Sequence, residues 1–317
     1  MAYFVGQTIA ASDFMSFRGV NSPSTPFPGL VAATDAVAAL IGSGFGSRGY
    51  GQTSVLLNAV TPGEVIAASQ WNQIYDAMQL INVHTGAGLT MPDMVITGET
   101  ITANDGSLGR PNLGTLISSL DSARLSYSLS QMALTSVLSS VRTDAWNATV
   151  NHEFTASFSN ENDARYFFNT GGQIYLAASR SGGTANHVNA ALTQMLAQMG
   201  TIKIGAQSTT YTGSGGISYP IGYYGLTSTY QTLFVHYGNL YGYTALTYSV
   251  TAKVENIINA NGGNGSVLRV RATVATNGGG YYGHYGPDGT LTSNISQLKA
   301  SNALTVNPPI FLTTVGL

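Results

Sequence analysis

The chain has 317 residues and no cysteine, and 8% of its residues are charged, compared with roughly 25% in an ordinary soluble domain. The lack of cysteine excludes disulfide-stapled scaffolds, thiolate metal sites and cysteine nucleophiles. A hydrophobic fraction of 44% argues against a disordered chain, and a net charge of −2 gives no overall attraction for nucleic acid.

The low charge is the most unusual feature of the composition. Interface cores are depleted of charge, so such a surface is natural where it is buried against other chains. A secreted or cell-surface carbohydrate binder is the competing interpretation. Residues 29–41 are rich in alanine and valine, but the stretch is short and Asp35 interrupts it, so we expect no membrane insertion. The first residues lack a basic region and a long apolar region, so we expect no signal peptide.

The two halves of the chain differ in charge. Residues 1–163 contain 12 acidic and 5 basic side chains, whereas residues 164–317 contain 2 acidic and 7 basic ones. Opposite signs favour head-to-tail contact between copies, although chance clustering in a sparsely charged chain explains them equally well. Lys203 is the one charged residue of the sequence between 181 and 252.

Three segments of the first half share the pattern Gly-x-x-Ile-x-Ala-(Ser/Asn). They are residues 6–14, 63–71 and 98–106. We predict that each leads from a short extended piece into a helix. The predicted N-caps are Ser12, Ser69 and Asn104, because their side-chain oxygens can accept a hydrogen bond from the first helical turn.

Apolar residues with helical spacing follow the second repeat. They are Trp71, Ile74, Tyr75, Met78 and Ile81. This spacing predicts an amphipathic helix that ends at the turn 84–88, and a further helix is predicted over 121–141. We therefore assign residues 1–150 to a mainly helical region for docking or oligomerisation.

Period-two alternation dominates the second half. Strands are predicted near His152–Phe158 and at 173–178, 202–204, 209–211, 233–237, 244–255 and 267–276. The last two are expected to form a hairpin. Helices are predicted at 161–168, capped by Asn160, and at 185–199. The predicted class is α+β: a helical N-terminal arm with short strand-helix repeats, and a β-rich, sandwich-like domain over 151–317 with one or two packed helices.

Tyrosine is concentrated in the second half, where 12 of the 18 tyrosines lie between residues 211 and 285. Tyrosine among glycine, serine and asparagine is typical of binding surfaces, but aromatic residues also favour sheets. Both interpretations stay open. The candidate interface or binding residues are Tyr223, Tyr224, Tyr241, Tyr243, Tyr281 and Tyr282.

No motif indicates catalysis, and we predict no catalytic residue, no metal, no cofactor and no enzyme activity. Residues 44–49 match G-x-G-x-x-G, but a preceding strand and a following helix are not expected, so a flexible loop is predicted. Glu161 and Asp163 fit the first turn of a helix. Arg269 and Arg271 share one strand face, where they could meet an acidic partner but are expected to be solvated.

Several short segments resemble structural proteins of tailed-bacteriophage virions. They are Asp-Ala-Arg-Tyr-Phe-Phe-Asn at 163–169, Gly-Gly-Gln-Ile at 171–174, Met-Gly-Thr-Ile at 199–202 and the Ile-x-Ala repeats, especially 66–72. The resemblance covers about residues 60–275. It implies assembly and carries no catalytic content.

We therefore expect a structural component of a tailed phage virion, in the tail, the baseplate or the tail-fibre attachment. Such a protein is made in the host bacterial cytoplasm and then resides in the virion. The expected partners are other virion structural proteins and copies of the chain, as a trimer or hexamer, without nucleic acid. One alternative is a receptor- or glycan-binding fibre tip that uses the six tyrosines on a host surface glycan. The other is a capsid or neck decoration protein.

Overall fold

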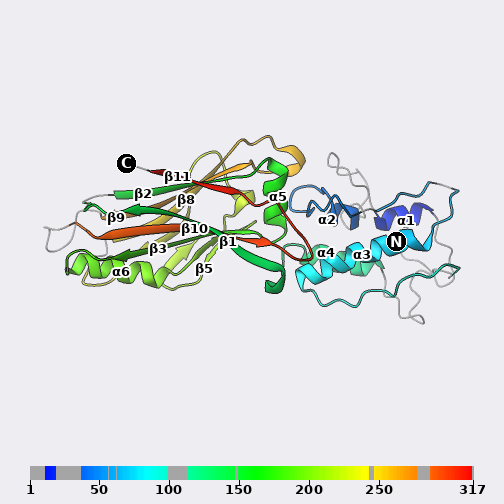
Figure 1. Ribbon diagram of the computed structural model, residues 1–317, viewed down its shortest axis with the longest axis horizontal. Coiled ribbons are helices and arrows are strands. Elements are labelled where there is room, and N and C mark those ends of the chain that lie inside the picture. The colour runs from blue at the N-terminus through cyan, green and yellow to red at the C-terminus, as the bar shows by residue number, and fades with distance from the viewer. Residues whose placement is uncertain are drawn as a thin grey trace.

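A computed structural model describes residues 11–18, 37–55, 57–61, 63–98, 113–146, 149–242, 246–276 and 286–315. The chain is mixed helix and strand, with the helices of residues 11–123 at one end and two antiparallel sheets at the other (Figure 1). We call residues 11–123 the helical part and residues 129–315 the two-sheet body.

The helical part has its own hydrophobic core. Its helices are α1 (Ala11–Arg18), α2 (Val37–Ile41), α3 (Ala68–Thr85) and α4 (Leu113–Ala123). The predicted apolar face of α3 is confirmed, because all five of its apolar residues are buried. Phe14 of α1 meets Trp71 edge-on, with ring centroids 5.0 Å apart. Ala300 and Leu304 of the two-sheet body join this core.

The predicted N-caps do not hold where the structure describes them. The N-cap of α3 is Ala67, whose N–H donates to Gln70 Oε1 at 2.7 Å, so Ser69 lies inside the first turn. Ser12 lies within α1, and Asn104 is outside the described residues. The Gln70 side chain therefore accepts from the N–H of the N-cap residue itself, and no side chain caps the first turn of α3 in the predicted way.

The helix predicted over 121–141 is wrong. After α4 and a 3₁₀ turn at Leu129–Gln131, the chain forms strand β1 (Met132–Arg142). The threonine and valines of this segment favour a strand, and pairing with β10 decides the conformation. The two-sheet body consequently begins before residue 150.

Neighbouring strands are antiparallel in both sheets. The first sheet has the order β1-β10-β3-β4-β5, with β3 (Gln173–Ser181), β4 (Ile202–Ile204), β5 (Thr209–Tyr211) and β10 (Thr290–Ala300). The second has the order β11-β2-β9-β8-β7-β6, with β2 (Thr149–Ser157), β6 (Gly216–Ser218), β7 (Gln231–Tyr237), β8 (Leu246–Glu255), β9 (Val267–Thr276) and β11 (Ile310–Val315). The expected hairpin of β8 and β9 is confirmed.

The inner faces of the two sheets enclose the larger core. Every second residue of β8 is buried, from Leu246 to Val254, as the period-two pattern predicts. Helix α5 (Glu161–Asn169) and helix α6 (His187–Met199) contribute to this core, and α6 packs against β3, β7 and β8. The α+β class with a β-rich part is confirmed, whereas β6, β10 and β11 were not predicted.

Helix α5 joins the helical part to the two-sheet body. Asn160 caps it as predicted, accepting from the Asp163 N–H at 2.9 Å. Arg165 is fully buried, and its guanidinium donates to the carbonyls of Ser43 and Gly46. Asn169 donates to the carbonyls of Gly46 and Gly49, both at 3.0 Å. We call Arg165, Asn169, Tyr224 and the loop 43–49 the junction socket.

The G-x-G-x-x-G segment forms the wall of this socket, which corrects its prediction as a flexible loop. Gly49 has φ +97°, and a Cβ there would lie 2.5 Å from the Ser43 carbonyl oxygen. The Tyr224 hydroxyl lies 2.7 Å from both the Gly46 oxygen and Asn169 Oδ1. The glycines thus let the loop turn its carbonyls toward a buried cation.

Candidate assembly surface

Strands β1 and β11 are the outer strands of their sheets and lie beside one another. Each ends its sheet in the strand order, and β1 packs against both β11 and β2. Met132 at the start of β1 packs on the core of the helical part, and β11 begins opposite Ser157, at the end of β2 that leads into α5. Both strands therefore run away from the junction.

Large apolar side chains are exposed along these two strands. We call them the edge seam: Leu129 (76% exposed), Leu134 (60%), Val137 (69%), Val141 (53%), Ile310 (70%) and Leu312 (57%). Single exposed apolar residues are ordinary on a protein surface. Six on two adjacent edge strands and the turn before them form a feature of the kind that marks an interaction site.

A β-bulge sets the outward side of β1. Thr135 pairs with Gln297 and Leu138 with Ile295, so β1 takes three steps where β10 takes two. The extra residue lets Leu134 and Val137, three positions apart, both face outward. In a regular strand one of them would point to the interior.

The edge seam lacks the charges that usually protect a sheet edge. Natural edge strands commonly carry lysine or another charged side chain that discourages association. Strand β1 has one charged residue, Arg142 at its last position, and β11 has none. The seam is therefore suited to burial against another protein surface.

The charges on the six-stranded sheet are paired within the sheet. Arg271 donates to Glu153 Oε2 at 2.8 Å, and Arg269 donates to Glu255 Oε1 at 2.8 Å. The Arg271 guanidinium also lies 4.2 Å from the Tyr230 ring centroid. Burial raises the pKa of Glu153, but hydrogen bonds led by Arg271 outweigh it and hold that pKa below its usual value. The expectation of solvated arginines is corrected: both have partners in their own chain.

The structure separates the six candidate tyrosines. Tyr223 is 1% exposed, stacks on Phe168 at 4.5 Å and donates to the Gly265 carbonyl, so its ring belongs to the core. Tyr224 is half-buried in the junction socket. Tyr241 is 57% exposed and stacks on His187 at the start of α6.

The remaining three, Tyr243, Tyr281 and Tyr282, lie outside the described residues. Among the candidate tyrosines that the structure describes, Tyr241 is thus the one whose ring is exposed at the surface. The internal places of Tyr223 and Tyr224 have a common physical reason: each hydroxyl finds buried acceptors, which lets the aromatic ring enter a core.

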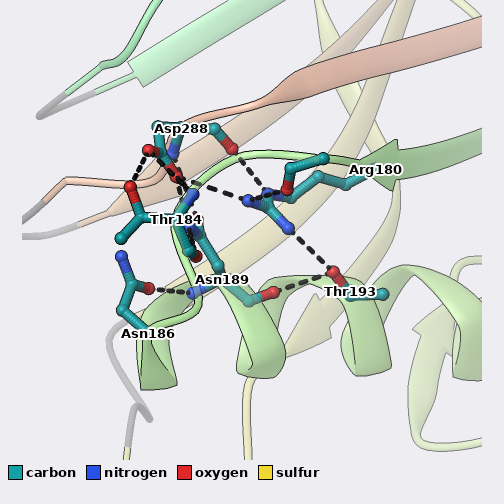
Figure 2. A network of polar contacts seen from close by, with 7 residues as sticks. Arg180, Thr184, Asn186, Asn189, Thr193 and Asp288 are labelled. Carbon is teal, nitrogen blue, oxygen red and sulfur yellow. Dashed lines mark hydrogen bonds and ion pairs between the residues drawn. The ribbon is translucent and has the colours of Figure 1, made fainter.

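A polar cluster, the distal latch, fixes the loop before α6 (Figure 2). Asp288 accepts hydrogen bonds from the Thr184 N–H at 3.0 Å, from the Thr184 hydroxyl at 2.6 Å and from the Asn189 amide. Arg180 donates to the Asp288 carbonyl at 2.7 Å, and Asn186 caps α6. Hydrogen bonds from Thr184 and then Asn189 hold the pKa of Asp288 below its usual value.

Two properties of the described residues bear on chemistry. They contain no group of three or more histidine, aspartate or glutamate side chains placed to hold a metal ion. None of the described helices is long and apolar enough to cross a membrane.

A cleft of about 400 Å³ lies between the helical part and the body, lined by residues 50–54, Asp163, Tyr166 and residues 305–307.

The sequence did not predict the edge seam. The apolar residues of β1 were assigned to a helix, and the segment of β11 was given no structure. The usable signal was β-branched content: Thr135, Val137 and Val141 in one segment, and the alternation of Ile310-Phe-Leu-Thr-Thr-Val in the other. No family model matches this chain, and no curated protein or solved structure matches it either.

Proposed function

We propose that the chain is a structural component of a tailed-phage virion, in the tail, baseplate or tail-fibre attachment, and that it acts by subunit packing. The observation that carries this proposal is the edge seam. It places six exposed apolar side chains on two uncharged outer strands and the adjoining turn. Burying such residues removes apolar area from water at a gain of roughly 25 cal/mol per Å².

The segments that resemble phage virion proteins have structural roles in this fold, which supports the proposal. In 163–169, Phe167 and Phe168 are fully buried in the larger core, while Arg165 and Asn169 hold the junction socket. Residues 199–202 connect α6 to β4. A motif that builds a junction and a core is consistent with an assembly protein and requires no reaction.

The proposed occupant of the edge seam is a second copy of the chain. The seam is apolar, so seams from several copies can pack together around a common symmetry axis without any matching of charge. The low overall charge is consistent with this arrangement because self-association meets little like-charge repulsion. A closed trimer or hexamer is the form that we propose.

Sedimentation velocity on the full chain tests the packing. Val137→Lys places a charge in the seam and is expected to weaken association about tenfold or more. The matched control is Ile217→Lys on β6, the edge strand at the other side of the six-stranded sheet, where the side chain is 52% exposed. Equal association by both variants and the unmodified chain would contradict the role of the seam.

Immunogold labelling tests the place in the particle. Antibodies against the chain are expected to label the tail, the baseplate or the fibre attachment of purified virions. Label confined to the head or neck would instead support a decoration protein. Virions that carry no label at all would contradict the virion assignment.

A second candidate function is recognition of a host receptor or surface glycan at the end of the body distant from the junction. The observation in its favour is the exposed Tyr241 ring, which the His187 ring holds in place at 4.3 Å beside the distal latch. Glycan-array binding by the full chain that is lost in Tyr241→Ala would support it. An array without any bound glycan would contradict it.

A further inference from the structure

A cleft of about 230 Å³ lies on the outer side of the five-stranded sheet. Its walls come from the segment after α4, the start of β3 and the turn between β4 and β5. The cleft is smaller than the sites of about 300–1,000 Å³ that hold drug-sized molecules, and its size suits a single sugar ring.

Lys203 is the cation of this cleft. It lies in the middle of β4, and its ammonium nitrogen is 5.3 Å from the centroid of the Tyr175 ring on β3. In the described part of the chain, Lys203 makes no ion pair. The one charged residue of the sequence between 181 and 252 therefore lines a cleft with its positive charge uncompensated by a carboxylate there.

Gln173 supplies an unsatisfied polar atom at the same place. Its Nε2 donates to the Tyr127 hydroxyl at 3.0 Å, while its Oε1 is buried without a hydrogen-bond partner. If the amide is turned over, the orphan becomes a nitrogen donor, so one polar atom lacks a partner in either orientation. This polar atom is closed to solvent, so the Gln173 side chain bears on the cleft through its contact with the Tyr127 hydroxyl.

Tyr127 adds a donor. When the Gln173 amide donates to its hydroxyl, the Tyr127 O–H proton stays available for an acceptor in the cleft. The ring lies against Gly171, where a Cβ would come within 2.3 Å of a ring carbon, so glycine is required for this close approach. Ser208 and Thr210 line the same cleft.

We propose that this cleft binds a sugar acid, that is, a single ring bearing both hydroxyl groups and a carboxylate. The carboxylate would accept from the Lys203 ammonium and the Tyr127 hydroxyl. The ring hydroxyls would meet the hydroxyls of Ser208 and Thr210, since a hydroxyl can donate or accept. The proposal is independent of association through the edge seam, which lies on β1 and β11 and the turn before β1.

The test measures binding of small ligands to the full chain by saturation-transfer NMR and calorimetry. The probes are D-galacturonate, D-galactose, which lacks the charge, and glutarate, which lacks the ring hydroxyls. Galacturonate is expected to bind saturably and about tenfold more tightly than either of the others, as the loss of a charge-assisted hydrogen bond implies.

The chain offers a matched control for the lysine. Lys253 also lies over a tyrosine ring, with its ammonium 5.2 Å from the Tyr230 centroid, but it pairs with Glu255 on the other sheet. Lys203→Met is expected to weaken galacturonate binding about tenfold, and Lys253→Met to leave it unchanged. Gln173→Leu removes the partner of the Tyr127 hydroxyl and should weaken galacturonate binding by a smaller factor. Circular dichroism would verify that each variant is folded.

Several results would overturn the proposal. Galacturonate that shows no saturable binding would do so directly. Galactose binding equal to galacturonate would remove the role of the cation, and glutarate binding equal to galacturonate would point to an acidic peptide and not to a sugar. Equal losses in Lys203→Met and Lys253→Met would show that the effect lies outside the cleft.

Discussion

The junction socket and the distal latch each hold a loop in place, at opposite ends of the body and with different chemistry. In the socket, a fully buried cation, Arg165, holds a loop through its backbone carbonyls. In the latch, the half-exposed carboxylate of Asp288 holds a loop through the N–H and hydroxyl of Thr184. Polar interactions gain strength when water is excluded. Loss of the socket should therefore lower the stability of the whole molecule, whereas loss of the latch should affect only its own loop.

The difference between the socket and the latch has a functional consequence. The socket fixes the helical part to the two-sheet body, so a force or a contact at one reaches the other through α5. The latch sets the loop beside Tyr241 and His187 and ties it to β3 through Arg180. A structural subunit needs the first property, and a recognition loop needs the second.

Loss of the Arg165 guanidinium is expected to have the largest effect. Arg165→Leu removes the guanidinium from the buried carbonyls that accept from it and should lower the free energy of unfolding by about 3 kcal/mol or more. The control is Arg271→Leu at a partly exposed ion pair, where about 1 kcal/mol or less is expected. Chemical denaturation measures both variants.

The two tryptophans report on the two regions separately during that experiment. Trp71 lies in the core of the helical part and Trp146 in the core of the body. With each tryptophan replaced in turn by phenylalanine, the remaining fluorescence follows one region. Arg165→Leu should split one transition into two, and a single shared transition in that variant would contradict the proposed coupling.

Backbone conformation in the socket should have the next largest effect. Gly49→Ala forces a Cβ to 2.5 Å from the Ser43 oxygen at φ +97°, and should destabilise the chain by about 1–3 kcal/mol. Gly46→Ala is the matched control, since its φ is +57° and its added Cβ meets no atom within 4 Å. Thermal unfolding measures both, and equal shifts would show that the loop's conformation is not required by the socket.

Buried histidines predict a moderate dependence on pH in both regions. Burial lowers the pKa of His84, which contacts the Thr170 carbonyl at 3.0 Å, and burial also lowers the pKa of His152, 2.8 Å from Ser293 Oγ. A base with a lowered pKa in the folded state contributes full stability above its unfolded pKa, about 6.5, and loses it as pH falls.

The free energy of unfolding should therefore decrease from pH 7.5 to pH 5.5. His152→Asn should reduce this slope, because one of the two groups that take up a proton on unfolding is removed. A slope that is unchanged in this variant would show that His152 does not report on the body core.

The smallest global effect is expected at the latch. Asp288→Asn removes the charge that accepts from Thr184, so the amides of residues 184–189 should exchange hydrogen faster while the unfolding midpoint stays nearly constant. The pKa of Asp288 is lowered, so the contribution of its carboxylate is complete above the usual aspartate range and is lost as pH falls below it. A large loss of global stability would erase the distinction between latch and socket.

Regular amphipathic patterns allowed the sequence to predict much of the fold. The alternation along β8 and β9 and the spacing along α3 gave the correct elements, because each buries one continuous face. The segment of β1 gave a wrong prediction because a bulge breaks the two-residue period of the strand. The spacing of Leu134, Val137 and Leu138 then fits a helix as well. The seam could not be predicted because exposure at a sheet edge depends on strand order.

The junction socket was hidden for a different reason. A glycine-rich loop reads as flexible when its partner is unknown, and the partner, Arg165, lies more than a hundred residues away. Likewise, the paired charges of Arg271 and Glu153 depend on the register between β2 and β9. Long-range pairing supplies information that local spacing does not contain.

The most direct test of the account is the association of the full chain at increasing concentration, followed by sedimentation velocity. We expect a trimer or hexamer that forms with the unmodified chain and with Ile217→Lys, and that forms about tenfold more weakly or not at all with Val137→Lys. A chain that stays monomeric and soluble at high concentration would contradict the claim that the edge seam packs against a second copy.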